Sequence, residues 1–296
     1  MIESEKIYKL YKGKVVIRFT EPGHKYWLIE ENGKQVKPMK RLTGVTSFTG
    51  KVIDKSDTLI KWALGLTTEY LEDHMDELKK KNADMQAIFE EAKQASGLEK
   101  QRAADIGKGV HAWIEAHVNG EMPEMPEDPK VLRGVNSFIQ WADENGAKFL
   151  WSERLVYSRK FGFTGTADIG LKLTKGEHKG KKPLGDWKVS NGLYPSVKMQ
   201  TAGYQGAIQE ENPKEKFDGR LAVRISSESE EEYMERMEKK WSRRGYKIAI
   251  PKYVPFESMY FPEESFKDDY RVAMHAWEII QWGRRTDKEF KAAKNK

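Results

Sequence analysis

Residues 161–189, FGFTGTADIGLKLTKGEHKGKKPLGDWKV, contain the pattern that decides the predicted fold. Phe161 to Leu173 alternates as a half-buried strand does, and a polar turn over 175–180 separates it from another such run, Lys181 to Val189. Phe149 to Tyr157 has the same period, so it predicts the first strand of a hairpin with the Phe161 run. These three consecutive strands are the centre of the expected sheet.

Helices and further strands surround this unit. Ile106, Val110 and Ile114 lie at helical spacing, so they predict a buried stripe on a helix over 105–118. The other expected elements, in chain order, are an antiparallel β element over 15–36, helices between 59 and 104, a helix through 135–141, a helix over 195–208, a strand over 221–225, a charged helix within 227–244, a strand over 246–254 and a helix over 270–282. This order predicts an α/β fold with a central mixed β-sheet flanked by helices.

No internal repeat and no sharp change of composition divides the chain, so we expect one domain over 1–296. Its expected parts are an N-terminal β-hairpin element (1–50), a helical arm (51–104), a catalytic core (105–226), a charged insertion (227–245) and a C-terminal strand and helix (246–296). The charged stretch over 69–104 has two interpretations, a solvated helical face or an arm over a cleft.

The composition excludes several classes of protein. Of the 296 residues, 38% are hydrophobic and 33% are charged, and no apolar run is long enough for a membrane span. The first residues, MIESEKIYKLYKGK, lack the apolar core of a signal peptide, so we expect a cytoplasmic protein. Because there is no cysteine, disulfides, thiolate zinc sites and a cysteine nucleophile are excluded, and any metal must bind oxygen or imidazole. The net charge of +6 favours a polyanionic partner only weakly.

Asp186-Trp187-Lys188 is the sharpest chemical feature. Residues two apart on a strand share a face, so Asp186 and Lys188 project together and pair an oxygen ligand with a cation. Such a pair suits phosphodiester hydrolysis, in which a cation offsets the charge that builds on the phosphate oxygens. His111 lies on a predicted helix and Asp168 on a predicted strand, and these elements can bring both residues close to Asp186. The alternative interpretations are a solvent-face ion pair for Asp186 and Lys188 and a packing role for His111.

Two other motifs fail on spacing. Gly107-Lys108-Gly109 lacks the upstream glycine and the hydroxyl residue of a phosphate-binding loop. His111 and His117 lie six residues apart and therefore diverge on a helix, which excludes a zinc peptidase motif. Tryptophans such as Trp113 and Trp187 have two interpretations, core packing or stacking on bases.

Taken in order, these motifs resemble the RecB-like branch of the PD-(D/E)XK nuclease superfamily, which includes phage exonucleases and the mitochondrial genome maintenance exonuclease. The matching residues are Gly107 and His111 (Gly-x-x-x-His), Glu153 on the next strand, Gly165 and Asp168 (Gly-x-x-Asp), Asp186, Lys188 and Ser190 (Asp-x-Lys with a small polar residue), and Gln200 and Tyr204 (Gln-x-x-x-Tyr). The segments His24-Lys25-Tyr26-Trp27 and Gly44-Val45-Thr46-Ser47 are similar to the N-terminal part of phage members. Lys108, where the family often has a small hydroxyl residue, and the charged stretch over 227–244 depart from the pattern.

The resemblance implies a restriction-endonuclease-like core and a role for each matching residue. His111, Asp168 and Asp186 would bind Mg²⁺ or Mn²⁺, with the carbonyl oxygen of Val189 as a further ligand. Lys188 would orient or activate the attacking water. Gln200 and Tyr204 would contact DNA or steady the site, with Lys108 and Ser190 also near the phosphates. Glu153 has two interpretations, a catalytic acid or a charge at a strand edge.

The function implied is a metal-dependent DNA exonuclease that prefers single-stranded ends, in a bacterial or phage-infected cell, with a place in DNA repair or recombination. Two alternatives stay open. One is a structure-specific or nicking endonuclease, and the other is a non-catalytic DNA-binding recombination protein on the same fold.

Overall fold

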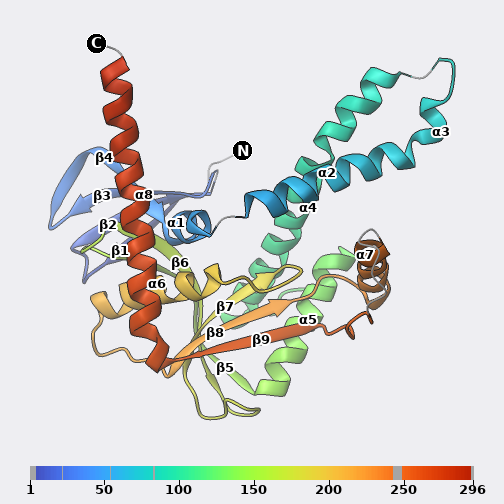
Figure 1. The fold of residues 1–296 in the computed structure, drawn as a ribbon. Helices are drawn as coiled ribbons and strands as arrows, with labels where there is room; N and C mark the ends of the chain where they lie inside the picture. Colours follow the sequence, from blue (N-terminus) through green and yellow to red (C-terminus); the bar gives the residue numbers. More distant parts are fainter. Residues whose placement is uncertain (1–4, 22, 54, 83, 243–248, 295–296) are drawn as a thin grey trace.

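The computed structural model describes residues 5–21, 23–53, 55–82, 84–242 and 249–294. Their strands form one nine-stranded mixed sheet in the order β1-β2-β3-β4-β6-β7-β8-β9, with β5 paired to β6 (Figure 1). The strands are β1 Glu5–Leu10, β2 Val15–Thr20, β3 Lys25–Glu31, β4 Lys34–Gly44, β5 Ala147–Tyr157, β6 Phe163–Leu173, β7 Pro183–Val189, β8 Gly219–Ile225 and β9 Phe256–Pro262. The predicted α/β class with a central mixed sheet is therefore confirmed.

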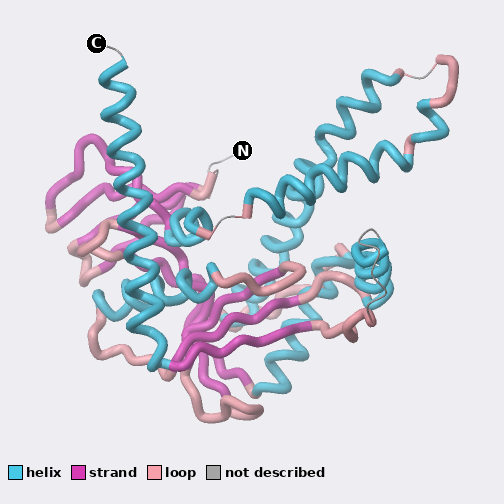
Figure 2. Tube along the Cα trace, in the orientation of Figure 1, coloured by secondary structure: helices cyan, strands magenta, loops and turns pink. Residues whose placement is uncertain are grey.

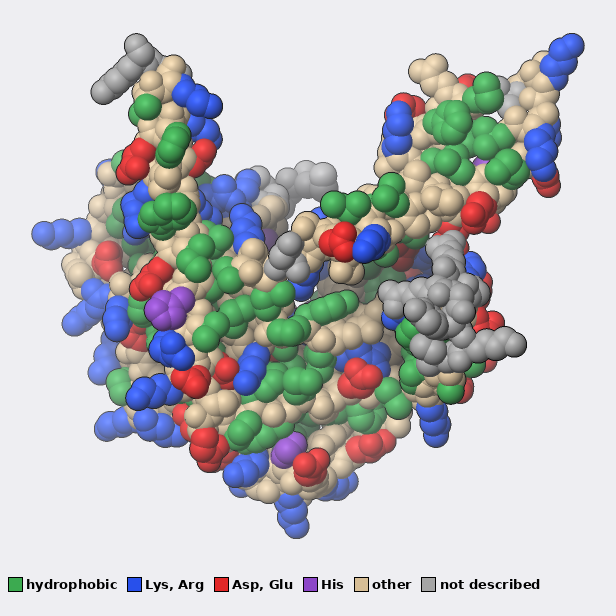
Figure 3. All heavy atoms as spheres, in the orientation of Figure 1, with side chains coloured by type: hydrophobic (Ala, Val, Ile, Leu, Met, Phe, Trp, Pro, Cys, Tyr) green, Lys and Arg blue, Asp and Glu red, His purple; other side chains and the backbone are tan. Residues whose placement is uncertain are grey.

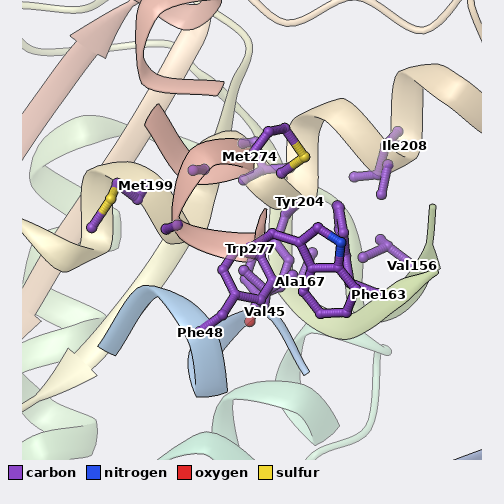
Figure 4. Close-up of a cluster of buried hydrophobic side chains, with 14 of the residues drawn as sticks. Val45, Phe48, Val156, Phe163, Ala167, Met199, Tyr204, Ile208, Met274 and Trp277 are labelled. Carbon is purple, nitrogen blue, oxygen red and sulfur yellow. The ribbon is translucent and has the colours of Figure 1, made fainter. Parts of the chain in front are cut away.

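Helices cover both faces of this sheet (Figure 2). They are α1 Val45–Val52, α2 Ser56–Asp73, α3 Met75–Leu78, α4 Met85–Val118, α5 Pro129–Asn145, α6 Ser196–Glu211, α7 Glu230–Ser242 and α8 Phe266–Lys294, with a 3-10 turn over Glu263–Ser265. On one face, α4 and α5 bury an apolar layer that includes Val110, Trp141 and Trp187. On the other face, α1, α6 and α8 enclose a second layer in which Phe48 and Phe163 pack edge-on against Trp277 (Figure 4).

The N-terminal β element is larger than the predicted hairpin. Strands β1 to β4 form an antiparallel meander, and β4 then pairs in parallel with β6 at Thr43 and Gly44. The element is thus continuous with the central sheet. The predicted hairpin of β5 and β6 is confirmed, and β7 follows in the predicted place.

The predicted arm and core are joined by one helix. α4 runs without a break from Met85 to Val118, so the expected boundary at 104/105 falls inside it. With α2 it forms a pair of helices, here called the arm, that projects away from the sheet (Figure 1). The apolar stripe that begins at Ile106 predicted a new helix, but it marks only the point at which α4 becomes buried, because the backbone hydrogen bonds continue through it.

The strand predicted over 246–254 is wrong in position. Residues 246–248 lie outside the described residues, 249–254 form no strand, and β9 begins at Phe256, opposite Ile225 of β8. Pro251 and Pro255 lack the N–H that a ladder needs, which delays the strand until both are passed. The predicted charged helix is present as α7, and Arg133 of α5 anchors it through Glu232.

Among the described residues, no helix combines the length and the apolar character that crossing a membrane requires.

Candidate active site

A gap beside β6 forms the candidate site. One edge of β6 pairs with β5, whereas the other pairs with β4 only at Phe163 and Thr164 and with β7 only at Ile169 and Gly170. Residues 165–168 lie between these two contacts and have no strand partner on that edge within the described part of the chain. A cavity of about 770 Å³ opens there. The sheet topology thus places the predicted Gly-x-x-Asp segment at the edge of a cavity.

Three side chains from three elements meet in this cavity. They are His111 of α4, Glu153 of β5 and Asp168 of β6, and one ligand atom from each lies within 4.8 Å of the other two. His111 Nδ1 is 3.8 Å from Glu153 Oε1, and each of these two side chains is about a third exposed. The helix that carries His111, α4, packs closely against α5 because Gly134 of α5 has no side chain. A Cβ at Gly134 would lie 2.6 Å from the Val110 side chain of α4.

Glu153 owes its place to an unusual backbone conformation. Its φ of 47° lies in the left-handed region, which non-glycine residues rarely adopt. Its neighbours Ser152 and Arg154 pair with Ile169 and Ala167, but Glu153 itself is left out of this register. A ligand atom of its carboxylate nevertheless lies within 4.8 Å of those of His111 and Asp168. Of its two interpretations, the geometry favours membership of the site over a charge at a strand edge.

Asp168 also holds β7 where the two strands diverge. Its Oδ2 accepts a hydrogen bond from the backbone N–H of Trp187 at 2.8 Å. The carboxylate therefore takes the place of a backbone carbonyl beyond the last β6–β7 pair. Within the described residues no hydrogen bond uses Oδ1, which leaves this oxygen available as a ligand.

Asp186 and Lys188 share a face of β7, as the strand period predicts. Trp187 between them packs on the opposite side, with ring centroids 5.3 Å from Phe138 and 5.0 Å from Trp141. Asp186 is fully buried, and its Oδ1 accepts a hydrogen bond from Gln200 Nε2 at 2.8 Å. Its Oδ2 forms an ion pair with Lys188 Nζ. Gln200 and Lys188 thus hold the buried carboxylate of Asp186.

Burial and mutual charge shift the pKa values in this site. Burial raises the pKa of Asp186 to about 6, against the opposing effect of Lys188, and it also raises the pKa of Asp168. Burial alone would lower the pKa of His111, but Glu153 and Asp168 outweigh it and the pKa is raised. Burial alone would also lower the pKa of Lys188, but the charges of Asp186 and Asp168 outweigh burial, and the pKa is raised. Burial therefore disfavours the charged forms of Asp168 and Asp186, and a cation bound nearby would stabilise those charged forms.

α6 supports the site from behind. Tyr204 approaches β6 so closely that a Cβ at Gly165 would lie 2.7 Å from its ring, which explains why glycine stands there. Gln200 Nε2 is also 3.2 Å from the Tyr204 hydroxyl, and both side chains are buried. Burial raises the pKa of Tyr204 well above its ordinary value, so the phenol stays protonated. Of the two implied roles, contacting DNA or steadying the site, burial favours steadying it.

The remaining predicted residues are divided. Lys108 and Val189 line the cavity, with Lys108 also 3.5 Å from Asp105. Ser190 does not line it, because its hydroxyl donates to the carbonyl of Gly192 at 2.9 Å. Glu115 is a cavity-lining acid outside the three-residue group.

Two cavity residues, Tyr26 and Thr166, had no role in the sequence argument. The Tyr26 hydroxyl is hydrogen-bonded to Thr166 Oγ1 at 3.1 Å and to His24 Nε2 at 2.8 Å. Burial raises the pKa of Tyr26 to about 12. The only sequence signal for Tyr26 was its place in the His24-Lys25-Tyr26-Trp27 segment.

The donor set fits a hard divalent cation. His111, Glu153 and Asp168 offer one imidazole and two carboxylates. Imidazole and carboxylate ligands of this kind can bind a divalent metal ion. The structure thus groups Glu153 with His111 and Asp168, whereas Asp186, which the resemblance implied as a ligand, lies outside this group, does not line the cavity and pairs with Lys188.

No family model matches the chain, and a search of curated proteins finds no match.

Proposed function

We propose that this protein is a divalent-metal-dependent deoxyribonuclease of the RecB-like PD-(D/E)XK type, with a restriction-endonuclease-like core. One observation carries the proposal: His111, Glu153 and Asp168 converge in a cavity next to Asp186 and Lys188 of the adjacent strand. Grouped acids with a neighbouring cation are the chemistry that phosphodiester hydrolysis needs. A bacterial or phage-infected cytoplasm, and a part in DNA repair or recombination, belong to the same proposal.

The residues divide the work by position. His111, Glu153, Asp168 and Asp186 would hold Mg²⁺ or Mn²⁺, with the Val189 carbonyl as a further oxygen. Such an ion would supply polarisation of the phosphodiester and a bound water that is more acidic than bulk water. Lys188, about a third exposed and lining the cavity, places a positive charge where a phosphate would enter. Gln200 orients Asp186 through its hydrogen bond, and Tyr204 fixes Gln200.

Exonuclease action on single-stranded ends, which the resemblance implies, belongs to the same proposal. Ala103, Ala104 and Lys108, at the base of the arm, line the cavity, whereas α2 contributes no lining residue. Of the two interpretations of the 69–104 stretch, an arm that roofs the cavity is therefore not supported; α2 and the outer part of α4 project away from the sheet (Figure 1). Lys239 Nζ and Glu69 Oε1, 2.8 Å apart, link α7 to α2 through a partly exposed pair of residues outside the cavity lining.

Metal-dependent nucleotide release from end-labelled single-stranded DNA tests the proposal. We expect release with Mg²⁺ or Mn²⁺ and none with EDTA. Asp168→Asn should lower the rate at least about 100-fold, since it removes a charge from the site while its amide oxygen can still accept the Trp187 N–H. Asp143→Asn is the matched control, because Asp143 is an exposed acid on α5 outside the cavity. Cleavage that persists in EDTA, or full activity of Asp168→Asn, would refute the proposal.

A further inference from the structure

Two more cavities continue from the catalytic cavity toward the C-terminal helix. The nearer, of about 380 Å³, shares Tyr26, Gly44 and Thr46 with the catalytic cavity. The farther, of about 400 Å³, shares Arg41, Thr43 and Arg284 with the nearer one. The three hollows therefore form one continuous path from the His111 group, past the end of β4, to α8.

The walls of this extension are strongly basic. Six cations line its two cavities and define what we call the basic groove: Lys25, Lys40, Arg41, Lys160, Arg284 and Arg285. Glu278 is the single acid among the described lining residues, and no ion pair between described residues joins any of the six cations to a carboxylate. Lys and Arg side chains also gather around α8 and the strands beside it in Figure 3. A hollow lined by unneutralised cations attracts anions.

The groove is built on fixed elements. Arg284 Nη1 donates to Thr43 Oγ1 at 2.6 Å, which joins α8 to the end of β4. Trp277 of α8 is buried between Phe48 and Phe163, at ring distances of 5.3 and 5.9 Å. Because α8 is anchored in the apolar layer, the cations on its exposed side keep their place relative to the catalytic cavity.

We propose that the basic groove binds the sugar-phosphate backbone of the nucleic-acid strand whose phosphodiester reaches the His111 group. This inference rests on the proposed nuclease function. The occupant must be a chain with repeated negative charge, since cations from β4, the β5–β6 turn and α8 follow one another along the path. Contacts of this kind position a strand without reading its bases. Binding should therefore be independent of sequence and sensitive to salt.

Fluorescence anisotropy with a labelled single-stranded oligonucleotide, in EDTA so that no cleavage is needed, tests this directly. Arg284→Gln/Arg285→Gln should weaken binding and lower the slope of log K against log salt by about 1.4, at about 0.7 per lost phosphate contact. Lys40→Gln/Lys160→Gln, on other elements and away from the Thr43 contact, should do the same. Lys267→Gln/Arg271→Gln is the matched control, because it removes two exposed charges from α8 outside the groove.

Each outcome decides the matter. Weaker binding with a lower slope in both groove variants, but not in the control, supports the groove. Equal weakening in all three would reduce the effect to net charge and overturn it, as would unchanged binding in both groove variants or no binding by the unsubstituted protein. Nucleotide release in Mg²⁺ or Mn²⁺ is measured separately. A protein that binds through the groove but never cleaves would refute the nuclease proposal and leave the groove as a nucleic-acid site.

Discussion

At the scale of single residues, the make-up of the candidate metal site depends on Glu153. Its backbone φ of 47° is strained for a non-glycine residue in a strand, and such strain persists where the surrounding structure imposes it. Here the strain brings a carboxylate to His111 and Asp168, where it joins a candidate ligand group. A residue whose sequence context allowed a strand-edge role thus becomes a central candidate.

Glu153→Gln tests that assignment. The amide keeps the size of the side chain but loses the charge, so we expect Mn²⁺ affinity to fall at least about tenfold in calorimetric titration, with loss of turnover. Glu115→Gln is the control, since Glu115 lines the same cavity outside the three-residue group and should bind Mn²⁺ normally. Unchanged Mn²⁺ affinity in Glu153→Gln would return Glu153 to a strand-edge charge.

At the scale of elements, α4 connects the arm to the candidate site. α4 serves two purposes, because its inner turns carry His111 and its outer turns pair with α2. The Glu69–Lys239 pair then connects the arm to α7, which Arg133 and Glu232 anchor to α5. The charged outer part of the arm is largely exposed, which agrees with its interpretation as a solvated helical face.

Circular and linear single-stranded DNA of the same sequence test the consequence. With equal salt and metal, we expect the linear molecule to be degraded and the closed circle to stay intact, because a circle offers no end to an exonuclease. The same circle cut once by annealing and restriction is the control and should become a substrate. Rapid loss of the uncut circle would favour the endonuclease alternative and would not contradict the proposed metal site.

At the scale of the whole molecule, a buried arginine joins the central sheet to the C-terminal helix α8. Arg220 of β8 is fully buried, and its guanidinium is 2.6 Å from Asp269 of α8. Lys198 of α6 is 3.2 Å from the same carboxylate, and Ser265 also donates to it. This cluster holds α8 against the sheet, and α8 in turn carries two cations of the basic groove.

Asp269→Asn should destabilise the fold by about 3–5 kcal/mol at neutral pH in urea unfolding, since it leaves Arg220 buried without its counter-charge. Burial opposes a low pKa at Asp269, but hydrogen bonds and charge from Arg220, Ser265 and Lys198 prevail and hold its pKa below the usual value of an aspartate. Its contribution is therefore present above the unfolded pKa and disappears as pH falls below about 4 through the folded pKa. The difference between the variant and the parent should shrink over that range.

Asp268→Asn is the control for that prediction. Asp268 is exposed and pairs only with its helix neighbour Arg271 among the described residues, so its loss should cost under about 1 kcal/mol. Equal effects of the two substitutions would show that the Arg220 cluster contributes no more than a surface pair.

The sequence by itself determined the order of most elements and the faces of the main strands. The period of two placed Asp186 and Lys188 together on β7, with Trp187 turned to the opposite side, and the structure agrees. Helical spacing likewise put Ile106, Val110 and Ile114 in the core. These features depend on neighbours a few residues away, which is why a local pattern predicts them.

Only the tertiary structure decided the composition of the site and its approach. Glu153 meets His111 because β5 takes a left-handed turn opposite Asp168, and the cavity exists because β4 and β7 leave a gap along β6. The basic groove joins residues 40–43, 160–162 and 277–285, which no local period connects. Strand register and the docking of α8 depend on packing between segments far apart in the chain, and that packing is absent from any local pattern.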